Sequence, residues 1–271
     1  ELDVVYKRAY GFRVSGAAWY DDVYQDSAEP GSALSGNYVN NHYNSYASRY
    51  IGGPSGEILD AFVFSNFRFG SVTGNVRAGQ HNVDWGESLY SIGNSIAYSQ
   101  GPVDTIKAAT SPGAEAKELY LPLKQVSTSI QLTNDLTLSA QYLFDWKPFR
   151  LVPGGTYFAQ ADGSRSDLGS AASTYPIPNG DDLDPSKKRG DYGVSLRWGP
   201  WWLAGTAGIY YRKFDEKLPW SFTQNIPTGF PAPFDLAPTD VRLAYARDTE
   251  LYGLSLAKTL ATMWVGAELS Y

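Results

Sequence analysis

Charged side chains recur at alternate positions of several extended segments, where they would share one face of a β-sheet. In a barrel, that face lines the interior, and rings of charged side chains can set the selectivity of a pore. Opposite charges can instead pair and fill the interior, so both interpretations stay open. The residues concerned are Arg13, Asp60, Arg68, Arg77, Asp145, Arg197, Arg212 and Glu268.

A second set of candidate residues belongs to the long segment 86–123. Asp84, Trp85 and Glu87 lie at its root, and Asp104 stands where a short helix could begin, because aspartate is a favourable N-cap. Two arrangements are open. The segment could fold into the interior as a constriction, or it could cap the outer rim, with Trp85 at a membrane interface and the acids bonded to nearby backbone.

Other chemistry is poorly represented. Asp181, Asp182 and Asp184 could hold a hard cation, but their spacing does not match an EF-hand loop, and a solvated acidic loop explains them more simply. The only histidines, His42 and His81, have no acid at metal-motif spacing, and there is no cysteine. We therefore expect no metal, no cofactor and no enzymatic activity, although a triad assembled from distant strands would leave no such spacing.

The elements that must position these residues are strands. In the segment 136–146, apolar residues alternate with polar ones, and only Leu143 breaks the alternation. Successive side chains of a strand point to opposite faces, so this pattern predicts a sheet with one apolar and one polar face. Aromatic residues gather at one end of the apolar face, as is typical of a strand that meets a membrane interface.

Alternation and turn residues predict about ten strands across the chain. Short turns and long polar connections alternate between them, and this asymmetry is typical of outer-membrane barrels. We expect one antiparallel transmembrane β-barrel domain over 1–271, with long outer loops near 25–57, 86–123, 147–190 and 215–248. The strands are expected at 2–8, 12–24, 58–69, 74–85, 126–131, 136–146, 191–198, 201–214, 250–257 and 263–271.

Composition agrees with a barrel. The net charge is −6, which argues against nucleic acid as a partner, and aromatic residues reach 15%. Mean hydropathy is −0.32, and no apolar run approaches the roughly 20 residues of a spanning helix. In a barrel only alternate residues face lipid, so a low average does not count against the membrane. The N-terminal residues lack the pattern of a signal peptide, which we expect to be removed or to lie outside this sequence.

Three ordered motifs, GQHNVDWGES at 79–88, GPVD at 101–104 and PGAEAKE at 112–118, resemble a family of large Gram-negative outer-membrane proteins known as domain of unknown function 1302. The resemblance continues through 136–146 and, more loosely, to the C-terminus. It implies a monomeric or trimeric barrel with further strands, so that this chain would be part of a larger wall. It also implies association with a periplasmic lipid-carrier-like protein and an inner-membrane transporter, and it carries over no catalytic residue.

Together these observations predict an outer-membrane channel for a small hydrophobic or amphipathic solute, in contact with outer-membrane lipid. A general diffusion porin and a structural or adhesive surface barrel are the alternatives. A soluble sandwich lectin is a more distant one.

Overall fold

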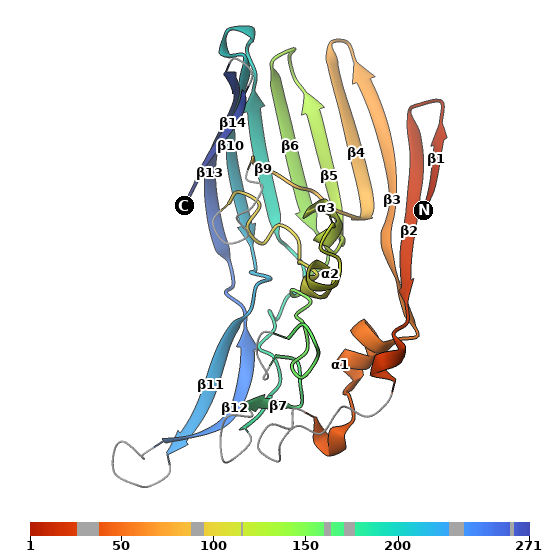
Figure 1. Ribbon diagram of the computed structural model, residues 1–271. Coiled ribbons are helices and arrows are strands. Elements are labelled where there is room, and N and C mark those ends of the chain that lie inside the picture. The colour runs from red at the N-terminus through yellow and green to blue at the C-terminus, as the bar shows by residue number, and fades with distance from the viewer. Residues whose placement is uncertain are drawn as a thin grey trace.

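The computed structural model describes residues 1–25, 38–87, 95–114, 116–159, 164–170, 177–227, 236–260 and 263–271. Its main element is a ten-stranded antiparallel sheet, in which strands adjacent in the chain are also adjacent in space (Figure 1). In order across the sheet, the strands are β1 (Leu2–Tyr6), β2 (Tyr10–Trp19), β3 (Ser55–Phe69), β4 (Val72–His81), β5 (Leu123–Gln131), β6 (Leu136–Leu143), β9 (Tyr192–Trp198), β10 (Gly205–Phe214), β13 (Thr249–Leu260) and β14 (Met263–Ser270).

The predicted all-β antiparallel fold is confirmed, but the sheet is open. Within the described part of the chain, β1 pairs only with β2, and β14 pairs only with β13, so each has one unpaired edge. Figure 1 shows these two strands at opposite sides of a curved sheet. Closure into a barrel therefore stays a prediction.

The strand register separates the side chains into two faces, because residues opposite one another on paired strands lie on the same face. We call one cross-strand line the apolar row and an adjacent line the polar row. The apolar row contains Phe67, Gly74, Ile130, Leu138, Leu196, Ile209, Leu254 and Leu269. The polar row contains Asn66, Asn75, Ser129, Ser139, Ser195, Tyr210, Gly253 and Ser270. One face of the sheet is therefore apolar, and the other is mainly polar.

Connections of different length are sorted to opposite ends of the sheet (Figure 1). The connections 7–9, 70–71, 132–135 and 199–204 lie at one end, and the described parts of the longer ones, within 20–54, 82–122, 144–191 and 215–248, lie at the other. This follows from the antiparallel order, since every second connection returns at the same end. The predicted sorting of short and long connections is confirmed.

Short elements occupy the long connections. The first of these connections carries η1 (Asp22–Tyr24), η2 (Val39–Asn41), α1 (Ser45–Ala47) and η3 (Ser48–Gly52), and the second carries α2 (Thr105–Thr110) and α3 (Ala116–Leu119). Later connections carry the pairs β7 (Leu168–Ser170) with β8 (Ile177–Pro178) and β11 (Trp220–Pro227) with β12 (Leu236–Ala244). η4 (Trp201–Leu203) follows β9. None of the described helices combines the length and apolar character that a membrane-crossing helix requires.

Several predicted strand ends are wrong. β6 ends at Leu143 and not at Trp146, which is buried and donates its indole N–H to the Glu216 carbonyl at 3.2 Å. Trp146 is therefore no part of an exposed aromatic belt. β4 likewise ends at His81 and not at Trp85, and the side-chain amide of Asn82 donates to the Tyr120 carbonyl at 3.0 Å.

Candidate functional site

Segment 95–123 lies against the polar face of the sheet, and Arg212 of β10 holds it there. The Arg212 side chain is almost fully buried, and its Nη1 donates to the carbonyl oxygens of Ile96 and Tyr98 at 2.8 and 2.7 Å. A guanidinium that donates to main-chain carbonyls fixes the path of the chain without needing an acidic partner. Arg212, which was predicted to face the interior, thus anchors segment 95–123.

Trp85 and Gln100 bind the same segment to the centre of the sheet. The Trp85 backbone N–H donates to Gln100 Oε1 at 2.9 Å, and Gln100 Nε2 donates to Gln141 Oε1 on β6 at 3.0 Å. The indole lies over Gly193, where a Cβ would come within 2.8 Å of the ring. Only glycine leaves room for the indole there. Trp85 therefore packs on the polar face and not at an exposed interface.

Glu268 of β14 receives the other end of the described segment. Its carboxylate accepts the backbone N–H of Glu87, and its Oε2 accepts that of Ile96 at 3.0 Å. The Glu87 carboxylate in turn pairs with Arg197 of β9 at 3.3 Å. Ile96 is completely buried and contacts Gly253, which is why a larger residue at 253 would displace it. Residues 88–94 of the predicted constriction loop lie outside the described residues.

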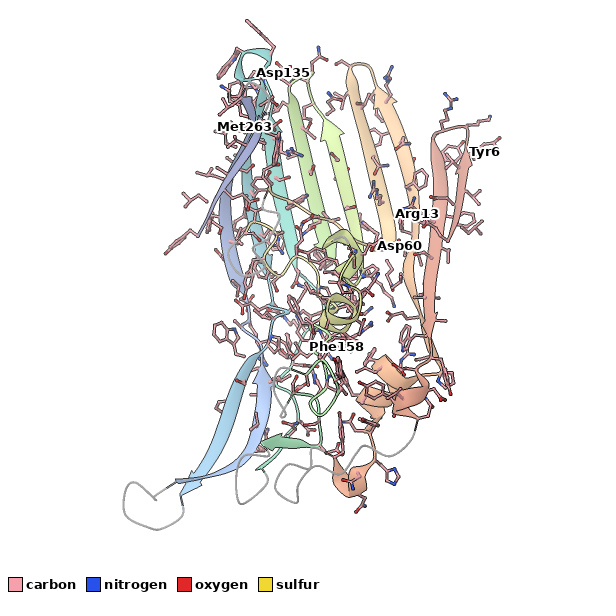
Figure 2. The ribbon with its side chains drawn as sticks, viewed as in Figure 1. Tyr6, Arg13, Asp60, Asp135, Phe158 and Met263 are labelled. Carbon is pink, nitrogen blue, oxygen red and sulfur yellow. The ribbon has the colours of Figure 1, made fainter. Side chains whose placement is uncertain are left out.

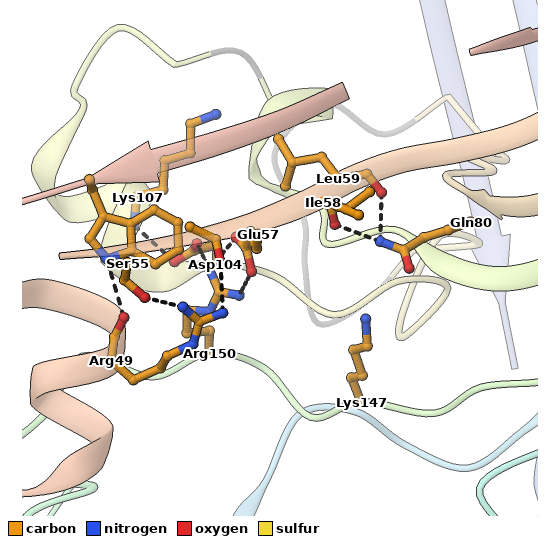
Figure 3. Close-up of polar contacts among 12 residues, drawn as sticks. Arg49, Ser55, Glu57, Ile58, Leu59, Gln80, Asp104, Lys107, Lys147 and Arg150 are labelled. Carbon is orange, nitrogen blue, oxygen red and sulfur yellow. Dashed lines mark hydrogen bonds and ion pairs between the residues drawn. The ribbon is translucent and has the colours of Figure 1, made fainter. Parts of the chain in front are cut away.

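A buried ion-pair cluster joins three distant parts of the chain, as Figure 3 shows. Arg150 Nη2 lies 2.6 Å from Glu57 Oε2 on β3, and Arg150 Nη1 lies 2.6 Å from Asp104 Oδ2. The side chains of Arg150, Glu57 and Asp104 are only 10%, 19% and 10% exposed. The guanidinium also lies over the Tyr50 ring, 4.3 Å from its centroid. This cluster fixes α2 relative to the sheet.

The predicted helix start at Asp104 is confirmed. Asp104 Oδ1 accepts the backbone N–H of Lys107 at 3.0 Å as the N-cap of α2, while its second oxygen binds Arg150. One carboxylate thus satisfies an unpaired helix N–H and a buried cation together. Thr105 strengthens the junction, because its backbone N–H and its hydroxyl both donate to the Arg150 carbonyl.

A second buried ion pair closes the end of β10. Lys217 is fully buried, and its Nζ lies 2.8 Å from Asp191 Oδ2. Burial lowers the pKa of the Lys217 ammonium and nearby Arg212 adds to this, although the Asp191 charge opposes the effect. The Lys217 backbone N–H donates to the Ser99 hydroxyl at 2.6 Å, so this pair also holds segment 95–123.

The lowered pKa of Lys217 makes a prediction for stability. The unfolded chain holds this proton up to the ordinary pKa of 10.5, whereas the folded chain releases it at a lower pH. Lys217 therefore makes its full contribution to the free energy of unfolding above pH 10.5. This contribution is lost as the pH falls through the pKa that Lys217 has in the folded chain. We expect the free energy of unfolding of the native protein, relative to that of Lys217→Met, to rise between neutral pH and pH 10.5. Urea unfolding at several pH values would measure this difference.

Lys188→Met is the matched control, because Lys188 pairs with Asp184 while its side chain stays 58% exposed. Its stability difference from the native protein should stay nearly constant over the same pH range. An equal slope for both variants would contradict the expected effect of burial.

Beside α2, a cavity of about 790 Å³ opens between the polar face of β2–β4 and the helix. Arg13, Asp60, Arg77 and His81 line it from the strands, and Lys107 lines it from α2. Figure 2 shows Arg13 and Asp60 on the neighbouring strands β2 and β3. The His81 ring is buried, with Nδ1 3.0 Å from the Gly79 carbonyl and Nε2 2.7 Å from the Ser127 hydroxyl. These contacts describe a packed histidine.

The register places most of the predicted interior residues on the polar face but brings few of them together. Arg68, Arg197 and Glu268 lie in one cross-strand line, and Arg77 and Arg212 lie in another. Glu87 and Arg197 form an ion pair, and Trp85 and Arg212 meet above Gly193.

Two other predicted residues lie apart from these contacts. Asp145 follows the end of β6 and pairs with Lys147 at 3.7 Å, so it is not part of a strand face. Asp84 is exposed at the edge of the segment. Partial desolvation and the nearby Glu268 charge raise the pKa of its carboxyl, against the effect of Arg212.

The acidic residues of 181–184 have local partners. Asp182 pairs with Arg165, and Asp184 pairs with Lys188 at 2.9 Å. His42 is exposed. Across the described ranges, no three His, Asp or Glu side chains gather closely enough to hold a metal ion.

Sequence reasoning missed the residues that hold the segment in place. Arg150 and Lys217 lie in connections with no periodic pattern, and their partners are far away in sequence. Gln141 was recognised as a polar strand residue, but nothing in the spacing indicated that it would bind Gln100. The alternation in a strand indicates on which face of the sheet a polar residue lies. The hydrogen-bond partner of that residue depends instead on how a long connection folds.

Comparison with known proteins identifies a family. No curated protein and no solved structure matches the sequence. One family model, described as protein of unknown function (DUF1302), matches residues 1–271, which is the whole chain. The same family was indicated by the motifs between 79 and 118. The chain therefore belongs to the DUF1302 family.

Proposed function

We propose that this chain forms part of the wall of an outer-membrane channel in a Gram-negative bacterium, and that the channel transports a small hydrophobic or amphipathic compound. The observation that supports this best is the separation of side chains across the sheet. Ile209, Leu254 and Leu269 of the apolar row are 54%, 53% and 67% exposed and its other members are half-buried, while a chain segment packs on the polar face. A sheet with its apolar face exposed needs an apolar environment.

Aromatic residues near both ends of the strands also support a membrane position. At the end with long connections, Tyr211 lies 6.1 Å from Tyr192 and 5.1 Å from Tyr252 between ring centroids. At the end with short turns, Trp198 lies 5.4 Å from Trp202. Exposed aromatic residues flanking an apolar band are typical of the two interfaces of a bilayer.

The free edges of β1 and β14 are part of the proposal. Backbone groups within a bilayer must be paired, and an open sheet edge exposed to lipid is costly. We propose that further strands pair with these edges and complete a barrel around segment 95–123. The segment would then narrow the interior, which favours a selective channel over a general diffusion porin.

Conductance and uptake test this function. The completed barrel, in which further strands pair with β1 and β14, is expected to show little steady conductance in planar bilayers, while proteoliposomes containing it take up an apolar fluorescent solute faster than empty ones. Large, stable conductance would support the diffusion porin. Unchanged uptake across a panel of lipids and aromatic compounds would instead support a structural or adhesive barrel.

The role of segment 95–123 can be tested at Ile96. Ile96→Asp places a charge in a fully buried site against Gly253, which costs several kcal/mol and should loosen the segment. We expect higher single-channel conductance from Ile96→Asp than from the native protein, and native conductance from Ile96→Leu. Equal currents from all three proteins would show that the segment does not narrow the pathway.

A further inference from the structure

Two cavities meet along one wall beside α2. The polar cavity described above and a second one of about 290 Å³ are both lined by Asp21, Ile51, Ile106 and Thr110. Small-molecule sites usually occupy about 300–1,000 Å³, so the larger cavity alone has the size of a ligand site and the pair slightly exceeds this range. Because both cavities contact the same four residues, an elongated molecule could occupy both.

The smaller cavity is mainly apolar. Besides the shared wall, its lining includes Val23, Tyr24, Val152 and Phe158. The hydroxyl of Tyr24 accepts the backbone N–H of Tyr157 at 3.1 Å, which joins the two sides of its rim. Phe158 lies toward the end of the sheet that carries the long connections (Figure 2). An alkyl chain suits this lining, because it removes apolar surface from water without leaving a polar group unpaired.

The larger cavity offers cations that the rest of the protein does not neutralise. Arg77 is exposed, and no described residue gives its guanidinium an ion pair or a hydrogen bond. The Lys107 ammonium donates to the Glu118 carbonyl at 3.1 Å, and none of the described carboxylates lies within ion-pair distance of it.

The other cations in this cavity are already paired, and it is also lined by six carboxylates, those of Glu1, Asp21, Glu57, Asp60, Asp104 and Glu118. Glu1 pairs with Arg13 at 3.6 Å, and Asp21 accepts the Val23 backbone N–H at 3.0 Å. Arg13 binds Asp3 at 2.5 Å, and Arg150 binds both Glu57 and Asp104. Asp60 accepts the Ser15 hydroxyl at 3.1 Å. Arg77 and Lys107 are therefore the groups with capacity for an incoming anion.

We infer that these two adjacent cavities bind one single-chain amphiphile with an anionic headgroup. Its headgroup lies between Arg77 and Lys107, and its alkyl chain passes Ile106 and Thr110 into the apolar cavity. Lys107 neighbours Ile106 on α2, so the proposed headgroup contact lies next to the shared wall. The inference rests on the proposed function in one respect only: the bound amphiphile would be the compound that the proposed channel transports.

Photolabelling tests this site directly. The full chain is held in amphipol, which avoids competing detergent, and is labelled with dodecanoate carrying a diazirine at the chain terminus. We expect labelled peptides from 23–24 or 151–158, with competition by unmodified dodecanoate and much weaker competition by dodecanol or dodecyltrimethylammonium. Labelling confined to other peptides, or equal competition by all three compounds, would overturn the inference.

Matched variants separate headgroup from chain binding. The double change Arg77→Gln and Lys107→Gln should weaken dodecanoate binding about a hundredfold or more, since it removes both charge-assisted hydrogen bonds to the headgroup. Arg68→Gln is its control, because Arg68 is exposed on the polar face outside this cavity. Thr110→Trp should reduce labelling, while Ala108→Trp, on the same helix but outside both linings, should not.

The same proteins keep this inference separate from the proposed function. Unchanged binding by the double variant and by Thr110→Trp would overturn the amphiphile site even if bilayer uptake is normal. Site-specific labelling in amphipol together with no uptake in proteoliposomes would support the site and contradict the channel.

Discussion

Arg150→Ala is expected to destabilise the protein by about 3–5 kcal/mol, because it leaves two buried carboxylates without their cation. Glu57 and Asp104 both lie 2.6 Å from this guanidinium, and their side chains are only 19% and 10% exposed. The change also frees α2 from β3. Urea unfolding followed by tryptophan fluorescence would measure the loss.

Arg13→Ala is the matched control for this prediction. Arg13 also pairs with a carboxylate on the polar face, but the Arg13 and Asp3 side chains are 39% and 40% exposed, so water can replace the lost partner. Its effect should be much smaller. Similar losses for the two variants would mean that the Arg150 cluster is more hydrated than its burial indicates.

Leu254→Arg is expected to cost about 2–4 kcal/mol in a bilayer, which is the penalty for a cation near the midplane on the lipid face of a barrel. Leu254 lies near the middle of β13, in the apolar row, and is 53% exposed within the described structure. About half of this side chain has no protein neighbour, so lipid is the environment that would make the change costly. Folding titrations in lipid vesicles would measure it.

Ser129→Arg provides the comparison on the opposite face. Ser129 is exposed in the polar row, where an arginine can stay hydrated. We expect a change within about 0.5 kcal/mol, as for ordinary surface substitutions. A neutral result for Leu254→Arg would contradict a lipid-facing position of the apolar row.

The alternation of apolar and polar residues predicted the strands well, because a sheet with one apolar and one polar face requires that alternation in each strand. Each predicted strand has a counterpart in the ten-stranded sheet, and Leu138 and Ser139 fall on opposite faces as expected. The period of two residues is local information, so no long-range contact was needed to recognise it.

Strand ends and connections were harder, since tertiary contacts decide them. Leu143 broke the expected alternation, and it is in fact buried as the last residue of β6. The proline-rich segment 215–248 was expected to be irregular, yet β11 and β12 pair there as a separate hairpin. Proline is tolerated in such edge strands because they need fewer backbone donors.

The candidate site was predicted only in part. Charge and alternation placed Arg77, Arg197 and Arg212 on one face, but the ion pair of Arg197 with Glu87 joins residues far apart in sequence. The anchoring contacts of Arg150 and Lys217 depend on how three long connections fold over the sheet. Only the N-cap at Asp104 depends on residues close to it in sequence, and it was therefore predicted correctly.

Cysteine scanning of β6 in lipid vesicles tests the account most directly, because the native sequence contains no cysteine. Single changes Leu138→Cys and Ala140→Cys lie on the apolar face, and Thr137→Cys and Ser139→Cys lie on the polar face. With an environment-sensitive fluorophore attached, we predict quenching by brominated lipid at 138 and 140 only. Equal quenching at all four positions, or none at any, would contradict a lipid-facing sheet.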